Sequence, residues 1–570
     1  MNSLLLVLLA IIGYILAYRF YGRFLARKIF RLSPEQVMPS HQFNDGMDYV
    51  PTKRNIIFGH HFTTIAGLGP IVGPAIGLIW GWLPAFLWVF LGSIFMGAVH
   101  DFSTLVVSAR NNGYTIGELT GHIISPGTRY VLQFIMQLLL FIVLAVFAMI
   151  VATLFVMYPE SVIPVWFQIP IAIWLGWNIR RGKPDLVYSI ISLLLLYLLV
   201  IAGVHMPVNL PWEDTTNVVV WSVLLFVYVF IASTLPVHKL LQPRDYINSH
   251  QLLVAMGLIV LGLIIRHPVL SAPAINSLAF APGSNVPSPA PLMFIVIACG
   301  AISGFHALAS SGTTVKQVSR EPDALPIGYG AMLTESFLAV LVIVSIAGGL
   351  GLGVMDGETI LTGRAAYLNH YASWESANGL ASKLDAFITG TANLFEAFGI
   401  PQRYGQSFVA VFIVTFANTT LDSATRIQRL SLQEIIGTGK GKVRSRLRNR
   451  YVSTLLIVSA AAALTFYKPG GQGAMILWPL FGSLNQLMGA LALGVVTVYM
   501  SAKRLPLQYT LLPMIIILIF TVWAMIQELT GFLKEKETLL VILSGVIIIL
   551  TGWLMTSAVR VILIKRSSPD

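Results

Sequence analysis

The sequence predicts an all-α polytopic integral membrane protein of about fifteen transmembrane helices, and three observations lead to this prediction. Hydrophobic residues make up 56% of the 570 residues and charged residues only 11%, whereas soluble domains carry about 25% charged residues. The apolar residues form continuous runs of roughly 18 to 25 residues, which suits membrane helices and not the alternating strands of a membrane barrel. Basic residues gather in the loops between these runs.

The first apolar run, residues 2–18, sets the orientation that we predict. Five basic residues between positions 19 and 31 follow this run and none precedes it, so we expect an uncleaved helix with its N-terminus outside. Alternation then places the C-terminus and the basic loop 423–449 in the cytoplasm, and the acidic loop 205–216 outside. The apolar runs lie near residues 2–18, 61–79, 84–107, 129–157, 161–178, 185–203, 217–236, 250–266, 292–311, 327–352, 404–422, 450–466, 474–501, 507–527 and 539–562.

Two of the runs contain residues that break helices. The stretches "FGHHFTTIAGLGPIVGPAIG" (58–77) and "ACGAISGFHALASSGTTVK" (298–316) are rich in Gly, Ser or Pro, and the loop charges give them opposite directions. Each opens a set of five runs, which predicts a five-plus-five inverted repeat with a binding site between the repeats. For the first stretch alone, the alternative is a ridge of small residues, Gly69, Gly73 and Gly77, that only lets helices pack closely.

The repeats predict the domain organisation of the chain. Between residues 353 and 403, apolar residues at steps of three and four (Leu384, Phe387, Ile388) predict an amphipathic helix over the outer mouth, either as a lid or as a plain interfacial helix. The expected parts are 1–58, the first helix and a cytoplasmic loop; 59–203, the first repeat; 204–291, two inserted helices and an external loop; 292–501, the second repeat with the external segment 353–403; and 502–570, two C-terminal helices.

We expect the substrate to bind where the two helices are broken. A broken helix exposes unpaired N–H groups at one end and carbonyl groups at the other, and such backbone persists in a membrane only where protein or a polar cavity covers it. The polar half-helix "WPLFGSLNQ" (478–486) suits the same cavity, although its amides could simply join helices. The candidate substrate-binding residues are Gly67, Gly69, Gly73, Ser303, Gly304, His306 and Asn485.

Ionisable residues inside the runs are candidates for proton coupling, because they are costly to bury and usually functional. Asp101 is the first candidate, followed by Glu335 and by His100. The structural alternative for Asp101 is a pair with Arg110 or with a neighbouring helix. For Asp422, an ion pair with Arg426, four residues further along the helix, is the favoured interpretation.

His60 and His61 lie at the start of the first broken run, where we expect them to serve a gate or helix packing. Adjacent histidines point about 100° apart on a regular helix, so they cannot jointly bind one ion from it. The alternative is a metal or haem site completed by His100 or His306, but the sequence contains no HxxxH or HExxH spacing. We therefore expect no metal and no other cofactor.

Four stretches of the sequence resemble those of the carbon starvation protein A (CstA) family: "DYVPTKRNIIFGHHFTTIAGLGPIVGPAIG", "MGAVHDFSTLVVSARNNGYTIGEL", "IACGAISGFHALASSGTT" and "LWPLFGSLNQLMGALAL". The resemblance implies a transporter of the bacterial or archaeal inner membrane. It also implies the LeuT/APC-like core of the amino acid–polyamine–organocation superfamily, with its five-plus-five inverted repeat. Family members are associated with peptide uptake, and close relatives with proton-coupled uptake of pyruvate.

We therefore expect a secondary active transporter that takes up small nutrients, peptides in the first place, during carbon starvation, with protons as the coupling ion. The alternatives are a pyruvate/proton symporter and, from another class, a metal- or haem-binding intramembrane protein. The sequence has no Walker A motif, and we expect no enzymatic activity. The expected partners are the substrate, the proton and membrane lipids. Nucleic acid is not expected, because topology explains the net charge of +12.

Overall fold

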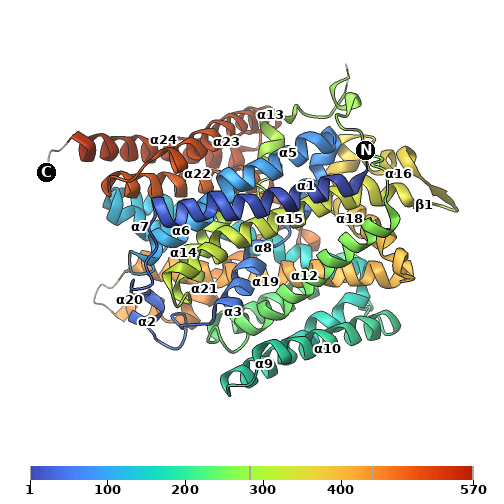
Figure 1. Ribbon diagram of the computed structural model, residues 1–570, viewed down its shortest axis with the longest axis horizontal. Helices are drawn as coiled ribbons and strands as arrows, with labels where there is room; N and C mark the ends of the chain where they lie inside the picture. The colour runs from blue at the N-terminus through green and yellow to red at the C-terminus, as the bar shows by residue number, and fades with distance from the viewer. Residues whose placement is uncertain (1, 282–283, 438–441, 568–570) are drawn as a thin grey trace.

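The computed structural model describes residues 2–281, 284–437 and 442–567. Long helices run side by side along one common direction, horizontal in Figure 1. The strands found in the described residues form one small antiparallel hairpin, β1 (Val354–Asp356) and β2 (Thr359–Leu361). The fold class predicted from the sequence, an all-α polytopic membrane protein, is confirmed.

Twelve of the described helical segments are long and apolar enough to cross a membrane, or thirteen if one bent pair counts as a span. The predicted runs 292–311 and 450–466 correspond to a broken segment and to a helix of only 16 residues. The α-helices of these twelve segments, in which α5 and α6 share one, are α1 (Ser3–Leu16), α5 (Trp82–Gly92), α6 (Ala98–Ala109), α8 (Pro126–Met157), α9 (Val162–Arg180), α10 (Asp185–His205), α11 (Asp214–Thr234), α12 (Leu241–Arg266), α15 (Ala331–Val344), α19 (Gln402–Ile436), α22 (Trp478–Ala502), α23 (Gln508–Glu535) and α24 (Thr538–Ser567). The short helices are α2 (Pro39–Gln42), α7 (Ile116–Ile123), α16 (Gly363–Tyr371), α17 (Trp374–Asn378), α18 (Leu380–Phe395), α20 (Lys442–Leu447) and α21 (Arg450–Thr465).

The two ends of the described chain lie at opposite ends of the helix bundle (Figure 1). The start of α1 lies at the same end as β1 and α16, whereas the end of α24 lies at the same end as α2 and α20. The described parts of the predicted basic loop 423–449, which are the end of α19 and helix α20, therefore belong to the same end as the end of α24. Lys440 of that loop lies outside the described residues. Which end faces the cytoplasm stays a prediction of the loop charges.

Both stretches that the sequence marks as interrupted are broken. The first consists of α3 (Arg54–Ile65) and α4 (Gly69–Gly77), and the pair is bent by 44°. The second consists of α13 (Pro289–Val296) and α14 (Gly304–Gly312), with seven residues of other conformation between them. Pro70 lies in the first turn of α4, where its missing N–H would have had no helical partner, and Pro74 removes a hydrogen bond inside it.

The two breaks lie against each other, and glycines allow their close approach. A Cβ atom on Gly69 would lie 2.1 Å from Sγ of Cys299, and one on Gly73 would lie 2.6 Å from the carbonyl oxygen of Val296. The small residues of the first stretch therefore do form a packing ridge, as the alternative interpretation held. The partner of this ridge is the second broken stretch, so the ridge and the broken helices belong to one arrangement.

Helix α18 lies inside the structure. Its residues Leu384, Phe387 and Ile388 are almost fully buried, and the helix packs against α4, α19 and the π-helical turn Ser345–Gly349. The predicted amphipathic helix is therefore present, and its role as a lid or as an interfacial helix stays a prediction. Its apolar face covers the first broken stretch, which places the start of α18 next to the breaks.

Candidate functional site

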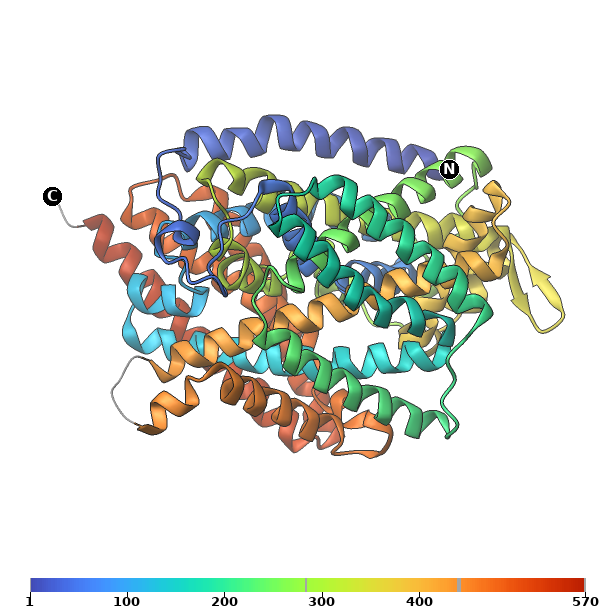
Figure 2. The ribbon, with the colours of Figure 1, turned by 90° about the horizontal axis from the view of Figure 1, so that it is seen from below.

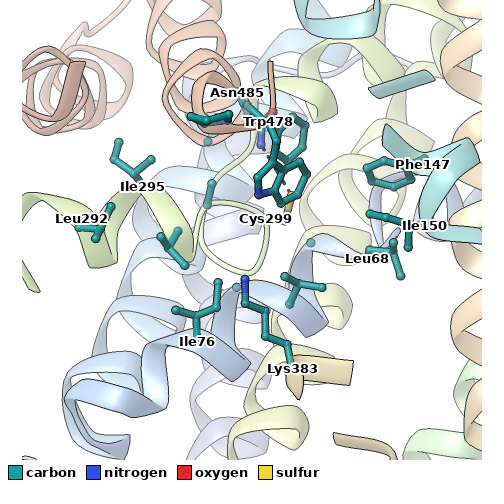
Figure 3. A pocket seen from close by; sticks show the side chains of 18 of the residues that line it. Leu68, Ile76, Phe147, Ile150, Leu292, Ile295, Cys299, Lys383, Trp478 and Asn485 are labelled. Atoms are coloured by element: carbon teal, nitrogen blue, oxygen red, sulfur yellow. Dashed lines mark hydrogen bonds between the residues drawn. The ribbon is translucent and has the colours of Figure 1, made fainter. Parts of the chain in front are cut away.

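A cavity of about 280 Å³ lies between the two breaks (Figure 3). Gly69 and Gly73 line it from α4, and Cys299 lines it from the second break. Asn485 and the aromatic ring of Trp478 line it from α22. Its volume is near the lower end of the range of small-molecule sites, roughly 300 to 1,000 Å³. The cavity is largely apolar and lies where both helices are interrupted, so it is the best candidate for a substrate site.

Two ionisable side chains, one basic and one acidic, line this cavity. The ammonium group of Lys383 points from α18 into the cavity (Figure 3), and the residue is only 4% exposed. Burial lowers the pKa of Lys383 to about 8, since the charged form is poorly solvated there. Glu528 of α23 accepts a hydrogen bond of 2.7 Å from the hydroxyl of Ser483. A ligand in the cavity can therefore meet both a cation and a carboxylate.

The predicted substrate-binding residues occupy three kinds of position. Gly69, Gly73 and Asn485 line the cavity. Gly67 lies against Thr420 of α19, and Gly304 lies against the backbone of Asn485, so both permit close packing outside the cavity. Ser303 and His306 lie just beyond the cavity, at the start of α14.

Asn485 connects the cavity to the second break. Its Oδ1 accepts a hydrogen bond of 2.9 Å from the backbone N–H of Phe305, and it lies 3.1 Å from the hydroxyl of Ser303. The first N–H groups of a helix have no partner within the helix, and Asn485 supplies one for α14. A change at Asn485 would therefore shift the start of the helix that carries His306.

A cluster of four ionisable residues lies buried beside the break, and the sequence had singled out each of them. His100, Asp101, His306 and Glu335 all have zero exposure. Nδ1 of His100 lies 2.7 Å from Oδ1 of Asp101, and Nδ1 of His306 lies 3.0 Å from Oδ2. A carboxylate only accepts hydrogen bonds, so both imidazoles donate through Nδ1. Asp101 therefore orients two histidines from two different helices.

His306 and Glu335 form the second contact of this cluster. Nε2 of His306 lies 3.3 Å from Oε2 of Glu335, but neither atom has a hydrogen bond of good geometry to any described residue. With Nδ1 of His306 already a donor, Nε2 of the neutral ring is an acceptor. Two acceptors at this distance need a proton between them, carried either by the ring or by the carboxyl group. The pair is therefore a place where one proton can be bound and released.

His60 and His61 have separate partners. Nδ1 of His60 donates to Oδ2 of Asp245 over 2.6 Å, and Gln317 lies on the other side of the ring. Nδ1 of His61 lies 2.9 Å from the hydroxyl of Thr314. Together the two histidines tie α3 to α12 and to the turn that follows α14, which is a position from which a gate could act.

The ion pairs of Asp101 with Arg110 and of Asp422 with Arg426 do not form, whereas the alternative contact of Asp101 with a neighbouring helix does, through His306 of α14. Arg110 pairs with Glu321, not with Asp101, because Asp101 faces the interior of the bundle. Asp422 pairs with Arg244 of α12 and accepts a hydrogen bond from Tyr228.

Arg426, the expected partner of Asp422, pairs with Asp48 instead, as does Arg429. Burial alone would raise the pKa of the Asp48 carboxyl, but Arg429 and Arg426 outweigh it and hold the pKa well below its usual value.

A metal site needs three or more ligand side chains that point at one position. Within the described ranges, no three His, Cys, Asp or Glu side chains are arranged to hold a metal ion. The expectation that the protein needs no cofactor stays a prediction.

Lys383 and Glu528, which both line the cavity, were not predicted from the sequence as site residues. Both lie next to segments that were identified, since Lys383 directly precedes Leu384 of the amphipathic pattern and Glu528 directly follows the apolar run 507–527. A lysine on an otherwise apolar helix face is the signal that could have drawn attention to Lys383. Glu528 offered no comparable signal, because a carboxylate at the end of an apolar run usually faces water.

Comparison with known proteins gives one family and several relatives. A family profile described as "Carbon starvation protein CstA" matches residues 2–524. The chain is 33% identical over 556 residues to "Peptide transporter CstA" of Mycobacterium tuberculosis (strain ATCC 25618 / H37Rv), with 88% of this chain and 72% of the relative covered. It is also 33% identical over 605 residues to "Pyruvate/proton symporter BtsT" of Escherichia coli (strain K12), with 94% and 83% covered.

Among solved structures, that of MhsT in complex with L-phenylalanine aligns with 84% of this chain and 98% of that chain, at 14% identity and a TM-score of 0.48.

Proposed function

The chain belongs to the family of carbon starvation protein CstA, and from this premise we propose that it takes up peptides through the cavity between its two breaks, driven by protons. The protein is a multi-pass transporter of the plasma membrane. One observation supports the peptide proposal above the others: the cavity presents both Lys383 and Glu528. A zwitterionic peptide offers a carboxylate to the lysine and an ammonium group to the glutamate.

The walls of the cavity suit the remainder of a short peptide. Phe147, Phe481 and Trp478 contribute aromatic surface, and Ile150 and Ile295 contribute aliphatic surface. Such walls bury apolar side chains of many shapes, because the gain depends on area and not on direction. We infer di- or tripeptides as the substrate class, since a cavity of about 280 Å³ leaves little room for longer ones.

In this proposal, the coupling proton binds within the buried cluster of His100, Asp101, His306 and Glu335. Glu335 and His306 share one proton, and Asp101 holds the ring of His306 in the tautomer that faces Glu335. Asn485 touches both the cavity and the start of α14, so substrate in the cavity and the proton on His306 act on the same short segment. Coupling then means that the two ligands favour the same arrangement of the break.

The second candidate is a pyruvate/proton symporter, and the name of the Escherichia coli relative favours it. Pyruvate carries a carboxylate but no ammonium group. In that case Lys383 would bind the substrate and Glu528 would not.

We further propose that residues 59–203 and 292–501 are the two inverted repeats, because each begins with one of the two breaks that meet at the cavity. His60 and His61 form part of a gate in this arrangement. We also propose that the protein has no enzymatic activity and no resident metal or haem, since Asp245, Thr314 and Asp101 engage ring nitrogens of its buried histidines.

Uptake into proteoliposomes under an inward proton gradient tests the proposal. We expect a labelled dialanine or trialanine to accumulate, with proton entry that requires the peptide. Lys383→Gln and Glu528→Gln should each reduce peptide uptake at least about tenfold. Uptake of pyruvate but not of peptides, with Glu528→Gln unchanged, would instead establish the second candidate. No uptake of either substrate would refute both.

A further inference from the structure

A second hollow, which shares no lining residue with the substrate cavity, lies on the outer surface of the bundle. It is an open groove of about 520 Å³ between α1, α15 and the start of α3. Its walls are apolar and include Ile11 and Ile15 of α1, Phe58 of α3, and Leu333 and Phe337 of α15. Figure 2 shows α1 along the outer edge of the molecule, and its outward residues are apolar, with Ile15 53% exposed. The groove therefore opens towards the hydrocarbon of the membrane.

The groove ends at basic residues. Arg19 and Arg23 line one end of it, and both are exposed. None of the described carboxylates forms an ion pair with Arg19 or Arg23. The end of the groove is thus a site of uncompensated positive charge beside an apolar channel.

The backbone of the first helix places these arginines on the groove. Groove residues recur at positions 11, 14, 15, 18, 19 and 23, so α1 turns one continuous face towards α15. At Ala17–Gly22 the helix widens to a π-helical turn, which shifts the following residues around the axis by about one position. A Cβ atom added to Gly22 would lie 3.0 to 3.1 Å from ring carbons of Tyr329, so this turn packs tightly against the bundle.

We propose that this groove binds an anionic phospholipid of the surrounding membrane. The acyl chains would lie against the apolar walls, and the phosphodiester would accept hydrogen bonds from Arg19 and Arg23, whose guanidinium groups match phosphate geometry. Topology alone explains basic residues after the first helix. It does not explain a groove that leads from the hydrocarbon region directly to two of them.

The groove lies directly behind the proton cluster. Leu333, Thr334 and Phe337 of α15 line it, while Glu335 of the same helix faces inward to His306. The hydroxyl of Tyr14, on the wall of the groove, lies 2.6 Å from the hydroxyl of Ser336. A bound lipid would therefore contact the helix that carries Glu335.

Native mass spectrometry of the purified full chain tests the proposal. Phosphatidylglycerol and phosphatidylcholine with the same acyl chains are titrated against the wild type, an Arg19→Gln/Arg23→Gln variant and an Arg27→Gln/Lys28→Gln control. The control removes the same charge from the same segment but outside the groove. An Ile15→Trp variant fills the groove at an exposed position without changing charge.

We expect the wild type to bind phosphatidylglycerol at least about tenfold more tightly than phosphatidylcholine, since each basic residue near a membrane surface attracts anionic lipid appreciably. Arg19→Gln/Arg23→Gln should abolish this preference, Ile15→Trp should weaken binding of both lipids, and the control should match the wild type. Equal loss in the two double variants, or no preference in the wild type, would overturn the proposal. Melting temperatures within a few degrees of wild type confirm that each variant is folded.

Discussion

Nε2 of His306 lies 3.3 Å from Oε2 of Glu335 inside a bundle that leaves neither side chain exposed. One residue comes from the first turn of a broken helix and the other from a neighbouring helix. Asp101 engages the opposite nitrogen of the ring, and we propose that a proton between His306 and Glu335 is bound or lost as the break moves. In the proposed mechanism of proton-coupled uptake, this contact connects the substrate cavity with proton movement.

Asp101→Asn should abolish proton-coupled uptake while leaving expression unchanged. An amide can donate a hydrogen bond to one histidine, so it no longer forces both rings to donate through Nδ1. The measurement is peptide-dependent acidification of proteoliposomes. Asp356→Asn, in the exposed hairpin, is the matched control and should behave as wild type. Normal uptake with an unchanged pH profile in Asp101→Asn would show that the residue is only structural.

Peptide binding should weaken as the pH rises through about 8. Below this pH the ammonium group of Lys383 is charged and attracts a carboxylate, whereas above it the group is neutral, because burial lowers its pKa to about 8. A bound carboxylate favours the charged form, so binding near pH 8 should also take up a proton. Calorimetry in two buffers of different ionisation enthalpy measures that uptake.

Lys383→Met is the comparison for this pH dependence. The variant should bind peptides weakly and keep only the part of the change near pH 8 that the α-amino group of the peptide causes, since its own pKa is about 7.7–8.0. An unaltered pH profile in Lys383→Met would show that another group causes it.

Gly73→Ala should destabilise the protein, because its methyl group would lie 2.6 Å from the carbonyl oxygen of Val296, which is backbone and cannot move aside cheaply. Overpacking of this kind costs about 1–3 kcal/mol. Gly257→Ala, within α12 and with no atom in reach of the new methyl group, is the control. The control should keep or slightly raise the melting temperature, which is read by thermal unfolding in detergent. Equal melting temperatures for the two variants would contradict the close contact of the breaks.

Alkylation of Cys299 should be slowed by substrate. The chain has one cysteine, and it lines the cavity beside Asn485, so a small maleimide reports on this site alone. Saturating dipeptide should reduce the labelling rate at least about fivefold, as followed by intact-protein mass spectrometry. A dipeptide variant without a free carboxylate should protect less. Labelling that no substrate affects would remove the cavity as the binding site.

The sequence allowed the broken helices and the buried acids to be predicted, since both depend on residue types that are rare in membrane helices. Gly69, Pro70 and Gly73 predict a break once the second stretch at 298–316 is set beside them, and a carboxylate such as Asp101 inside an apolar run is conspicuous wherever the helix lies. These signals are local, so one sequence is enough to read them.

Partners across the bundle could not be predicted in the same way. Asp422 has Arg426 four residues away on its own helix, yet it pairs with Arg244 of α12. Helix α12 packs against α19 and brings Arg244 to the side of α19 that carries Asp422. Lys383 likewise reaches the cavity only because α18 packs against α4. Such contacts depend on how helices are arranged in space, and spacing along the chain does not contain that information.

Glu335→Gln provides the most direct test of the central claim. In proteoliposomes loaded with unlabelled dipeptide, counterflow of labelled dipeptide measures substrate exchange, and accumulation under a pH gradient measures coupling. Gln cannot carry the shared proton, so we predict that Glu335→Gln retains counterflow at roughly the wild-type rate but no longer accumulates peptide in response to the gradient. Accumulation equal to that of wild type would contradict the account, because the proton would then not pass through the His306–Glu335 pair.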